Sequence, residues 1–248
     1  MSDSLCAETI KINGHNGDEI EAYLASPAGE HDRGGVVVIH HLPGYDRATK
    51  EIVRRFAELG YDAIMPNLYW REGGPGVSPD DAAAKARAEG GVPDERLIGD
   101  VGGAADYLRA LPTSNGKVGV IGYCSGGRQT VLAACNVDVD AAVDCYGAFV
   151  TGTPPEGFPL KVTNLVDQLP NLRAPLLGLF GNDDQYPSPE HVNELEEILK
   201  ADGKPYEFHR YDDAGHAFFS VDRPAYRVAA ANDGWERIEA FFNTYLGS

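Results

Sequence analysis

Residues 118–127 read Val-Gly-Val-Ile-Gly-Tyr-Cys-Ser-Gly-Gly, and this stretch decides the fold. The short β-branched run at 118–121 predicts a buried strand, and the segment 126–135 predicts a helix. A sharp turn between a strand and a helix lifts its central side chain, here Cys124, above the edge of the sheet. Glycines beside the turn leave room for neighbouring backbone. The pattern therefore predicts a nucleophile elbow, with Cys in the position that Ser usually occupies.

Short apolar runs alternate with longer amphipathic stretches along the rest of the chain. The runs predict strands at 20–25, 36–39, 63–65, 141–145, 176–180 and 206–211, and the amphipathic stretches predict helices at 49–59, 98–111, 189–201 and 225–246. We interpret 20–25 as a half-buried edge strand and 67–94 as an irregular excursion with one short helix. This alternation predicts an α/β protein with a mostly parallel central sheet, helices on both faces and a single domain over 1–248.

The composition excludes several classes of protein. The 21 Lys and Arg against 38 Asp and Glu give a formal charge of −17, which disfavours a nucleic-acid binder because such proteins neutralise phosphates with basic residues. There is no apolar run of about 20 residues and no basic leader, so we expect no membrane span and no signal peptide. The four cysteines form no C-x-x-C pair, which favours a reducing, cytoplasmic location. We expect a monomer or small homo-oligomer without a cofactor.

A nucleophilic thiol needs a base, and the base needs a carboxylate that orients it. Asp183 and Asp184 follow the strand predicted at 176–180, and His216 follows the one at 206–211. The order nucleophile, acid, histidine is that of a nucleophile-elbow enzyme. The pattern does not separate Asp183 from Asp184. The alternative is a buried structural Cys124 with unrelated polar loops, and the matching order favours catalysis.

The loop after the strand at 36–39 supplies the remaining part of the predicted site. An acyl-transfer site holds the developing oxyanion with two backbone N–H groups, and we expect those of Leu42 and Ser125 to do this. The neighbouring His40 and His41 also permit a metal site together with His216. We expect no metal, because no carboxylate or cysteine lies at metal-ligand spacing from them.

At this point the chain resembles the dienelactone hydrolase (carboxymethylenebutenolidase) family of the α/β-hydrolases over nearly its whole length. The motifs that carry the resemblance are MPNLY at 65–69, SNGKVG at 114–119, GYCSGG at 122–127 and AGHAF at 214–218. The resemblance implies the α/β-hydrolase fold and a hydrolase of small esters or enol lactones. It also implies Cys124 as the nucleophile, His216 as the base and Asp184 as the acid.

The resemblance also implies roles for two further residues, and two other positions differ from the family pattern. Arg71 matches an arginine that holds the substrate carboxylate, and Tyr146 matches an aromatic residue that lines the pocket. His41 stands where the family has a glutamate near the substrate, and Ser220 stands where the family has a second arginine. Arg223 is a candidate to replace that arginine. The alternatives are a carboxylesterase or thioesterase with another substrate, or a non-catalytic binding protein of the same fold.

Overall fold

The computed structural model describes residues 4–29 and 32–247. Its strands are β1 (Leu5–Asn13), β2 (Glu19–Pro27), β3 (Arg33–Ile39), β4 (Asp62–Pro66), β5 (Ser114–Tyr123), β6 (Ala141–Cys145), β7 (Leu176–Gly181) and β8 (Tyr206–Tyr211). Its helices are α1 (Arg47–Glu58), α2 (Trp70–Gly73), α3 (Pro79–Ala88), α4 (Asp94–Arg109), α5 (Ser125–Asn136), α6 (Pro189–Ala201) and α7 (Val228–Leu246), with short 3-10 segments at η1 (His15–Gly17) and η2 (Val166–Asn171).

The strands that the structure describes form one sheet in the order β1-β2-β4-β3-β5-β6-β7-β8. The pairs β1–β2 and β2–β4 are antiparallel, and all others are parallel. This confirms the predicted mostly parallel α/β-hydrolase fold. The register places Ile39 beside Gly122 and Tyr123 beside Cys145. The loops after β3, β5 and β6 therefore leave the sheet at the same edge, where open parallel sheets place their ligands.

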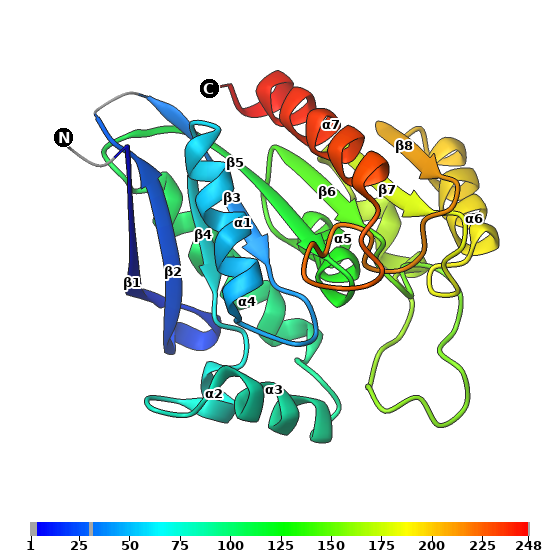
Figure 1. Ribbon diagram of the computed structural model, residues 1–248, viewed down its shortest axis with the longest axis horizontal. Coiled ribbons are helices and arrows are strands. Elements are labelled where there is room, and N and C mark those ends of the chain that lie inside the picture. Colours follow the sequence, from blue (N-terminus) through cyan, green and yellow to red (C-terminus); the bar gives the residue numbers. More distant parts are fainter. Residues whose placement is uncertain (1–3, 30–31, 248) are drawn as a thin grey trace.

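Helices cover both faces of the sheet, and β3 shows how the sequence produces this arrangement. All seven residues of β3 are buried. Because neighbouring side chains point to opposite faces, Val37 and Ile39 join the core beneath α4 and α5, whereas Val36 and Val38 join the core beneath α1 and α7. Figure 1 shows α1 and α7 in front of the sheet, with α4 and α5 behind it.

Two sequence predictions were wrong at the N-terminal half of the fold. The strand β1 was not predicted, because only Ile12 of its nine residues is fully buried and the apolar alternation is weak. As β1 occupies the edge, β2 pairs on both sides and is not the edge strand. The segment 67–94 holds α2, α3 and the start of α4 rather than one short helix. Ser78 caps α3 by accepting from the Asp81 N–H, as serine at an N-cap does.

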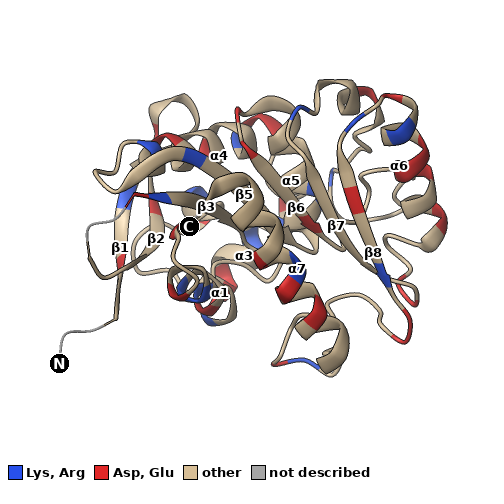
Figure 2. Ribbon diagram, turned by 90° about the horizontal axis from the view of Figure 1, so that it is seen from above, with Lys and Arg blue, Asp and Glu red and all other residues tan. Residues whose placement is uncertain are grey.

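Charged residues lie mainly on the outer surfaces of the helices and on loops. Figure 2 shows acidic residues, coloured red on the ribbon, on several elements, with a group of them along α6. In the described part of the chain, no helix combines the length and the apolar character that crossing a membrane requires.

Candidate active site

Cys124 lies at the turn between β5 and α5 in a conformation that few side chains adopt. Its φ is 60° and its ψ is −122°, which is a strained backbone for a residue other than glycine. A Cβ at Gly122 would come within 2.1 Å of the Gly126 carbonyl oxygen, and one at Gly126 within 2.6 Å of the Ile39 carbonyl oxygen. Side chains are excluded at both positions. The glycines therefore permit the close approach that projects Cys124 above the sheet.

His216 and Asp184 come from the loops after β8 and β7 and meet beside Cys124. The His216 Nδ1 lies 2.8 Å from the Asp184 Oδ2, and the Tyr186 N–H donates to the Asp184 Oδ1 at 2.9 Å. The Asp184 side chain is only 3% exposed. Its neighbour Asp183 is exposed. The geometry thus separates the two carboxylates that the sequence pattern left open, and it pairs Asp184 with the imidazole.

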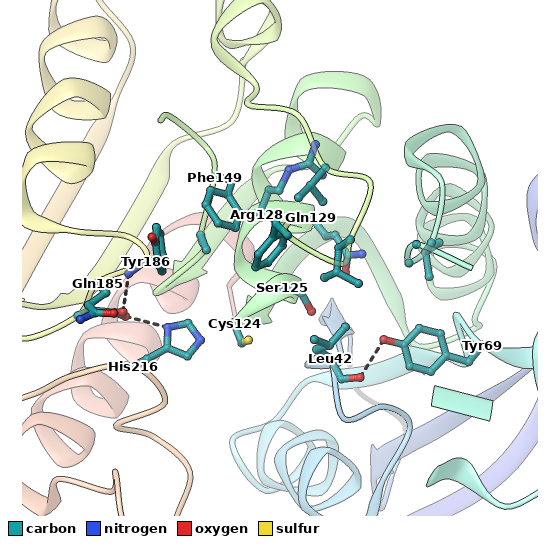
Figure 3. A pocket seen from close by; sticks show the side chains of 18 of the residues that line it. Leu42, Tyr69, Cys124, Ser125, Arg128, Gln129, Phe149, Gln185, Tyr186 and His216 are labelled. Atoms are coloured by element: carbon teal, nitrogen blue, oxygen red, sulfur yellow. Dashed lines mark hydrogen bonds and ion pairs between the residues drawn. The ribbon is translucent and has the colours of Figure 1, made fainter. Parts of the chain in front are cut away.

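The electrostatics of this group favour a charged sulfur. Burial by itself would raise the pKa of the Cys124 thiol, but hydrogen bonds from His216 and from the Ser125 and Leu42 backbone N–H groups lower it overall. Burial by itself would lower the pKa of His216, but its hydrogen bonds to Asp184 and Cys124 raise that pKa to about 10. The opposite shifts favour a thiolate–imidazolium pair. Figure 3 shows Cys124 between the His216 ring and Leu42.

The other buried thiols behave differently. Burial raises the pKa of Cys135 to about 11, and it raises the pKa of Cys145 well above the ordinary value of 9.0. Both lie among apolar core residues, and the nearby Lys204 offsets only part of the effect of burial at Cys135. Burial therefore disfavours the thiolate at these two positions, and the hydrogen bonds around Cys124 reverse that effect.

The backbone of Leu42 is held from two sides. The Tyr69 hydroxyl donates to the Leu42 carbonyl oxygen at 3.0 Å, and the Arg87 guanidinium lies 3.4 Å from the same oxygen. Tyr69 also packs edge-on against His40, with 4.7 Å between the ring centroids. No role was predicted for Tyr69 from the sequence, although its position just past β4, at the same edge of the sheet, is a signal of this kind.

His40 is a structural residue rather than a catalytic one. Burial lowers its pKa to about 4, so the ring is neutral. Its Nδ1 lies 2.9 Å from the His41 carbonyl oxygen, and the Leu68 N–H donates to its Nε2 at 3.3 Å. Both ring nitrogens are therefore occupied. Within residues 4–29 and 32–247, no group of three or more His, Cys, Asp or Glu is arranged to hold a metal ion.

Arg71 does not reach the catalytic cavity. Its Nη1 and Nη2 lie 2.8 and 2.9 Å from the two carboxylate oxygens of Asp100, and its Nε lies 2.8 Å from Asp18. Asp100 is fully buried, so it needs a cation to balance its charge. The expectation that Arg71 holds a substrate carboxylate does not fit this arrangement. Arg223 was the candidate to replace the second arginine of the family. It is exposed, and it lines neither the cavity that contains Cys124 nor the cavity beside α1.

His41 and Tyr146 line a neighbouring cavity of about 610 Å³ rather than the one that contains Cys124. The His41 Nε2 lies 2.5 Å from the Asp46 Oδ2, so this nitrogen is occupied by a carboxylate. Tyr146 is almost fully buried and packs edge-on against His216, with 5.2 Å between the ring centroids. Tyr146 therefore packs against the His216 imidazole. Neither His41 nor Tyr146 lines the cavity that contains Cys124.

The cavity at Cys124 has a volume of about 450 Å³ and contains residues that the sequence analysis missed. Phe149 packs against Phe158 on one side and Tyr186 on the other, with ring centroids 5.0 and 5.4 Å apart. Arg128 and Gln129, from the first turns of α5, also line the cavity. Phe149 and Phe158 lie in the long connection between β6 and η2, where no periodicity marked them as functional.

The comparisons with known proteins identify the family of this chain. The model of the dienelactone hydrolase family matches residues 20–246. A Methylorubrum extorquens protein provisionally named a carboxymethylenebutenolidase is 34% identical over 246 residues, which cover 98% of this chain and 83% of that protein. The Pseudomonas putida carboxymethylenebutenolidase is 29% identical over 237 residues and 92% of each chain.

A solved structure has the same fold as this chain. A Klebsiella pneumoniae protein, provisionally titled a dienelactone hydrolase, superposes with a TM-score of 0.85 at 29% identity, over 98% of this chain and 100% of that one. Sequence and structure thus agree over nearly the whole chain. The chain belongs to the dienelactone hydrolase family.

Proposed function

We propose that this protein hydrolyses a small ester or lactone through a Cys124 thioester, with His216 as the base and Asp184 as its orienting acid. One observation carries the proposal: the His216 imidazole bridges a buried carboxylate and a thiol that two backbone N–H groups also face. The names of the similar proteins support an ester or lactone as the substrate.

Acylation is the first half of the reaction. The Cys124 sulfur attacks the ester carbonyl carbon, and a C–S bond forms while the carbonyl oxygen becomes an oxyanion. The Leu42 and Ser125 N–H groups, which face the sulfur, lie where donors to this oxyanion are needed. The intermediate collapses, the C–O bond to the leaving group breaks, and protonated His216 donates its proton to the departing alkoxide.

Deacylation returns the enzyme to its starting state. His216, now neutral, accepts a proton from a water molecule as that water attacks the thioester carbonyl. The same N–H groups hold the second oxyanion. The C–S bond then breaks, the acid product leaves, and the Cys124 thiolate regains its partner, the protonated His216. Asp184 keeps the ring oriented throughout and stabilises its positive charge.

The proposal extends to the compartment and the partner. All four cysteines are free thiols, which supports a reducing cytoplasm. The cavity volume of about 450 Å³ supports a small-molecule substrate, since pockets of this size hold drug-sized ligands. We propose a monomer or small homo-oligomer that acts without a protein partner.

Turnover of 4-nitrophenyl acetate and mass spectrometry of the intact protein test the proposal. We expect the wild type to gain the mass of one acetyl group, and we expect peptide mapping to place that group on Cys124. Cys124→Ala should lose the adduct and essentially all turnover. Cys6→Ala, which removes an exposed thiol, is the matched control and should behave like the wild type.

The results also distinguish the alternative functions. Equal turnover by the wild type and Cys124→Ala would contradict the thioester mechanism. Absence of turnover and of adduct in the wild type, over a panel of ester, lactone and thioester substrates, would favour the non-catalytic binding protein. Faster turnover of thioesters than of matched oxygen esters would favour a thioesterase.

A further inference from the structure

The cavity beside α1 is larger than the one that contains Cys124, and its volume is about 610 Å³. Its lining residues come from α1, from the loop after β8 and from α7, on the face of the sheet that α1 and α7 cover (Figure 1). Neither Cys124 nor His216 lines it, and the two cavities share no lining residue in the described part of the chain. The proposed hydrolysis therefore leaves this cavity without a role.

Part of the lining of this cavity is a group of aromatic rings in mutual contact. The residues are Tyr123, Tyr146, Phe219 and Trp235. The ring centroid of Phe219 lies 5.6, 6.2 and 6.0 Å from the centroids of Tyr123, Tyr146 and Trp235. A ligand ring can pack edge-on or offset against such a surface, and it gains free energy beyond the burial of its area. The cavity therefore suits an aromatic ligand.

One face of α1 supplies charged groups to the same cavity. Arg47, Glu51 and Arg55 are spaced four residues apart, so they lie on one side of the helix, and all three line the cavity. Arg54 binds the Glu51 carboxylate, and Asp222, another acid of the lining, is exposed to water. Among residues 4–29 and 32–247, neither Arg47 nor Arg55 forms an ion pair with a carboxylate. Two guanidiniums are therefore available for an anion.

Arg55 is held in a position that suits a carboxylate. Its Cζ lies 3.9 Å from the centroid of the Trp235 ring, a cation–π contact. This stacking uses the flat face of the guanidinium and leaves the N–H groups at its edge for a ligand. The edge of a guanidinium matches the two oxygens of a carboxylate, and such paired hydrogen bonds are strong.

Tyr123 adds an unpaired polar atom at the same place. The residue is 4% exposed, and its hydroxyl is shielded from water and has no hydrogen-bond partner in the described part of the chain. Burial raises the pKa of Tyr123 well above 10.0, and the nearby positive charge of Arg55 acts in the opposite direction. The hydroxyl therefore keeps its proton and lies near the Arg55 guanidinium. A buried donor without a partner is costly, which favours a ligand that brings an oxygen atom to this part of the cavity.

We propose that the cavity beside α1 is a second ligand site, and that it binds a small aromatic carboxylate. The guanidiniums of Arg47 and Arg55 hold the carboxylate, and the ring packs against Phe219 and its aromatic neighbours. This inference goes beyond the proposed function, because neither Cys124 nor His216 takes part in the binding.

Tryptophan fluorescence tests the inference at the site itself. The chain has two tryptophans, and of these Trp235 lines this cavity whereas Trp70 lines another. The Trp70→Phe variant therefore leaves Trp235 as the reporter. We expect 3-phenylpropionate to change its emission, with a Kd about tenfold lower than that of 3-phenylpropionamide, because the amide has nearly the same shape but lacks the charge. No change in emission, or equal Kd for the two ligands, would overturn the inference.

Two arginines of the same helix provide a matched comparison in the Trp70→Phe background. Arg55→Gln removes a charge from the cavity, and we expect it to raise the Kd of 3-phenylpropionate about tenfold and that of the amide less than about threefold. Arg47→Gln should act in the same direction. Arg54 does not line the cavity, so Arg54→Gln is the control and should leave both Kd values unchanged. Equal Kd for the acid in Arg55→Gln and Arg54→Gln would contradict the proposed site.

A further variant shows which cavity holds the ligand. Phe149→Ala changes the wall of the cavity that contains Cys124, and we expect it to leave the Kd of 3-phenylpropionate unchanged. A higher Kd in Phe149→Ala, with no effect of Arg55→Gln, would place the ligand beside Cys124 and overturn the inference. These measurements need no turnover, so a protein that fails to hydrolyse any ester would contradict the proposed function and still test this site.

Discussion

Two histidine–aspartate pairs lie near the same edge of the sheet in the described part of the chain, and they use different ring nitrogens. His216 contacts Asp184 through Nδ1 at 2.8 Å, which leaves Nε2 for the Cys124 sulfur. His41 contacts Asp46 through Nε2 at 2.5 Å, and its ring lines the neighbouring cavity. The nitrogen farther from the backbone is the one that can reach a substrate. In His41 the carboxylate of Asp46 occupies this nitrogen, so we expect His41 to take no part in the proposed reaction.

The two carboxylates also have different tasks. Asp184 is buried, and its second oxygen accepts only the local Tyr186 N–H. Asp46 accepts from the N–H and the hydroxyl of Thr49 at 2.9 and 3.0 Å, and so it caps α1. A capping carboxylate stabilises a helix end whether or not a histidine binds it. Residue type and proximity therefore do not by themselves make a catalytic pair. The histidine also needs a ring nitrogen that is free of the carboxylate and faces a reacting group.

Removing each imidazole while keeping its hydrogen bond tests the comparison most strongly. Asn at 216 places an N–H near the position of Nδ1, and Gln at 41 places one near that of Nε2. We expect His216→Asn to lower kcat/KM about 10⁴-fold, since the base and acid are lost, and His41→Gln to lower it less than about tenfold. Steady-state kinetics with 4-nitrophenyl acetate measures both. Similar losses would mean that His41 shares in the chemistry.

Changing each carboxylate to an amide should produce a smaller difference in kcat/KM between the two pairs. Asp184→Asn removes the charge that stabilises the imidazolium, so we expect kcat/KM to fall about 10²-fold. Asp46→Asn should change it less than about threefold. The rate of Cys124 alkylation by iodoacetamide provides a second readout, and it should slow in Asp184→Asn alone. Unchanged alkylation in Asp184→Asn would remove that carboxylate from the proposed mechanism.

The two pairs should also lose stability at opposite ends of the pH range. The folded pKa of His216, about 10, lies above the ordinary 6.5, so its contribution is complete below pH 6.5 and disappears as the pH rises through 10. For Asp46, burial would raise the pKa, but the bonds from His41 and Thr49 lower it to about 2 from 3.8. Its contribution is complete above pH 3.8 and disappears as the pH falls through 2.

Urea unfolding over this range measures the opposite trends. We expect the stability difference between the wild type and His216→Asn to shrink between pH 6.5 and 10. The difference between the wild type and Asp46→Asn should shrink between pH 3.8 and 2. Parallel curves for the wild type and His216→Asn would show that the imidazolium is not stabilised in the folded state.

The smallest effect concerns the cap of α1. Asp46→Ala removes the acceptor for the Thr49 N–H, and we expect the free energy of unfolding to fall by about 1 kcal/mol. Ser78→Ala, which removes the cap of α3, is a matched control and should cost a similar amount. Both variants should keep kcat/KM within about threefold of the wild type. A much larger loss of activity in Asp46→Ala would indicate that the His41 pair positions the catalytic loop.

Local sequence patterns predicted much of the fold and named Cys124, Asp184 and His216, which the structure brings together, but they did not predict most of the other residues that line the cavity. The elbow at Cys124 and the strands beside it are encoded by glycines and β-branched runs that act over a few residues. The edge strand β1 was missed because little of it is buried. The pairing of Arg71 with Asp100 was not predicted, because Asp100 lies 29 positions away in the chain and no local pattern reports such a pairing.

The sequence by itself determined the parallel sheet, the sharp turn at Cys124 and the chain order of Cys124, Asp184 and His216, since these depend on hydrophobic periodicity and on where glycine is required. Only the tertiary structure decided which aspartate meets His216, which nitrogen of His41 meets Asp46 and which carboxylate pairs with Arg71. These outcomes depend on contacts between distant segments, where a side chain takes the partner that folding brings within about 3 Å.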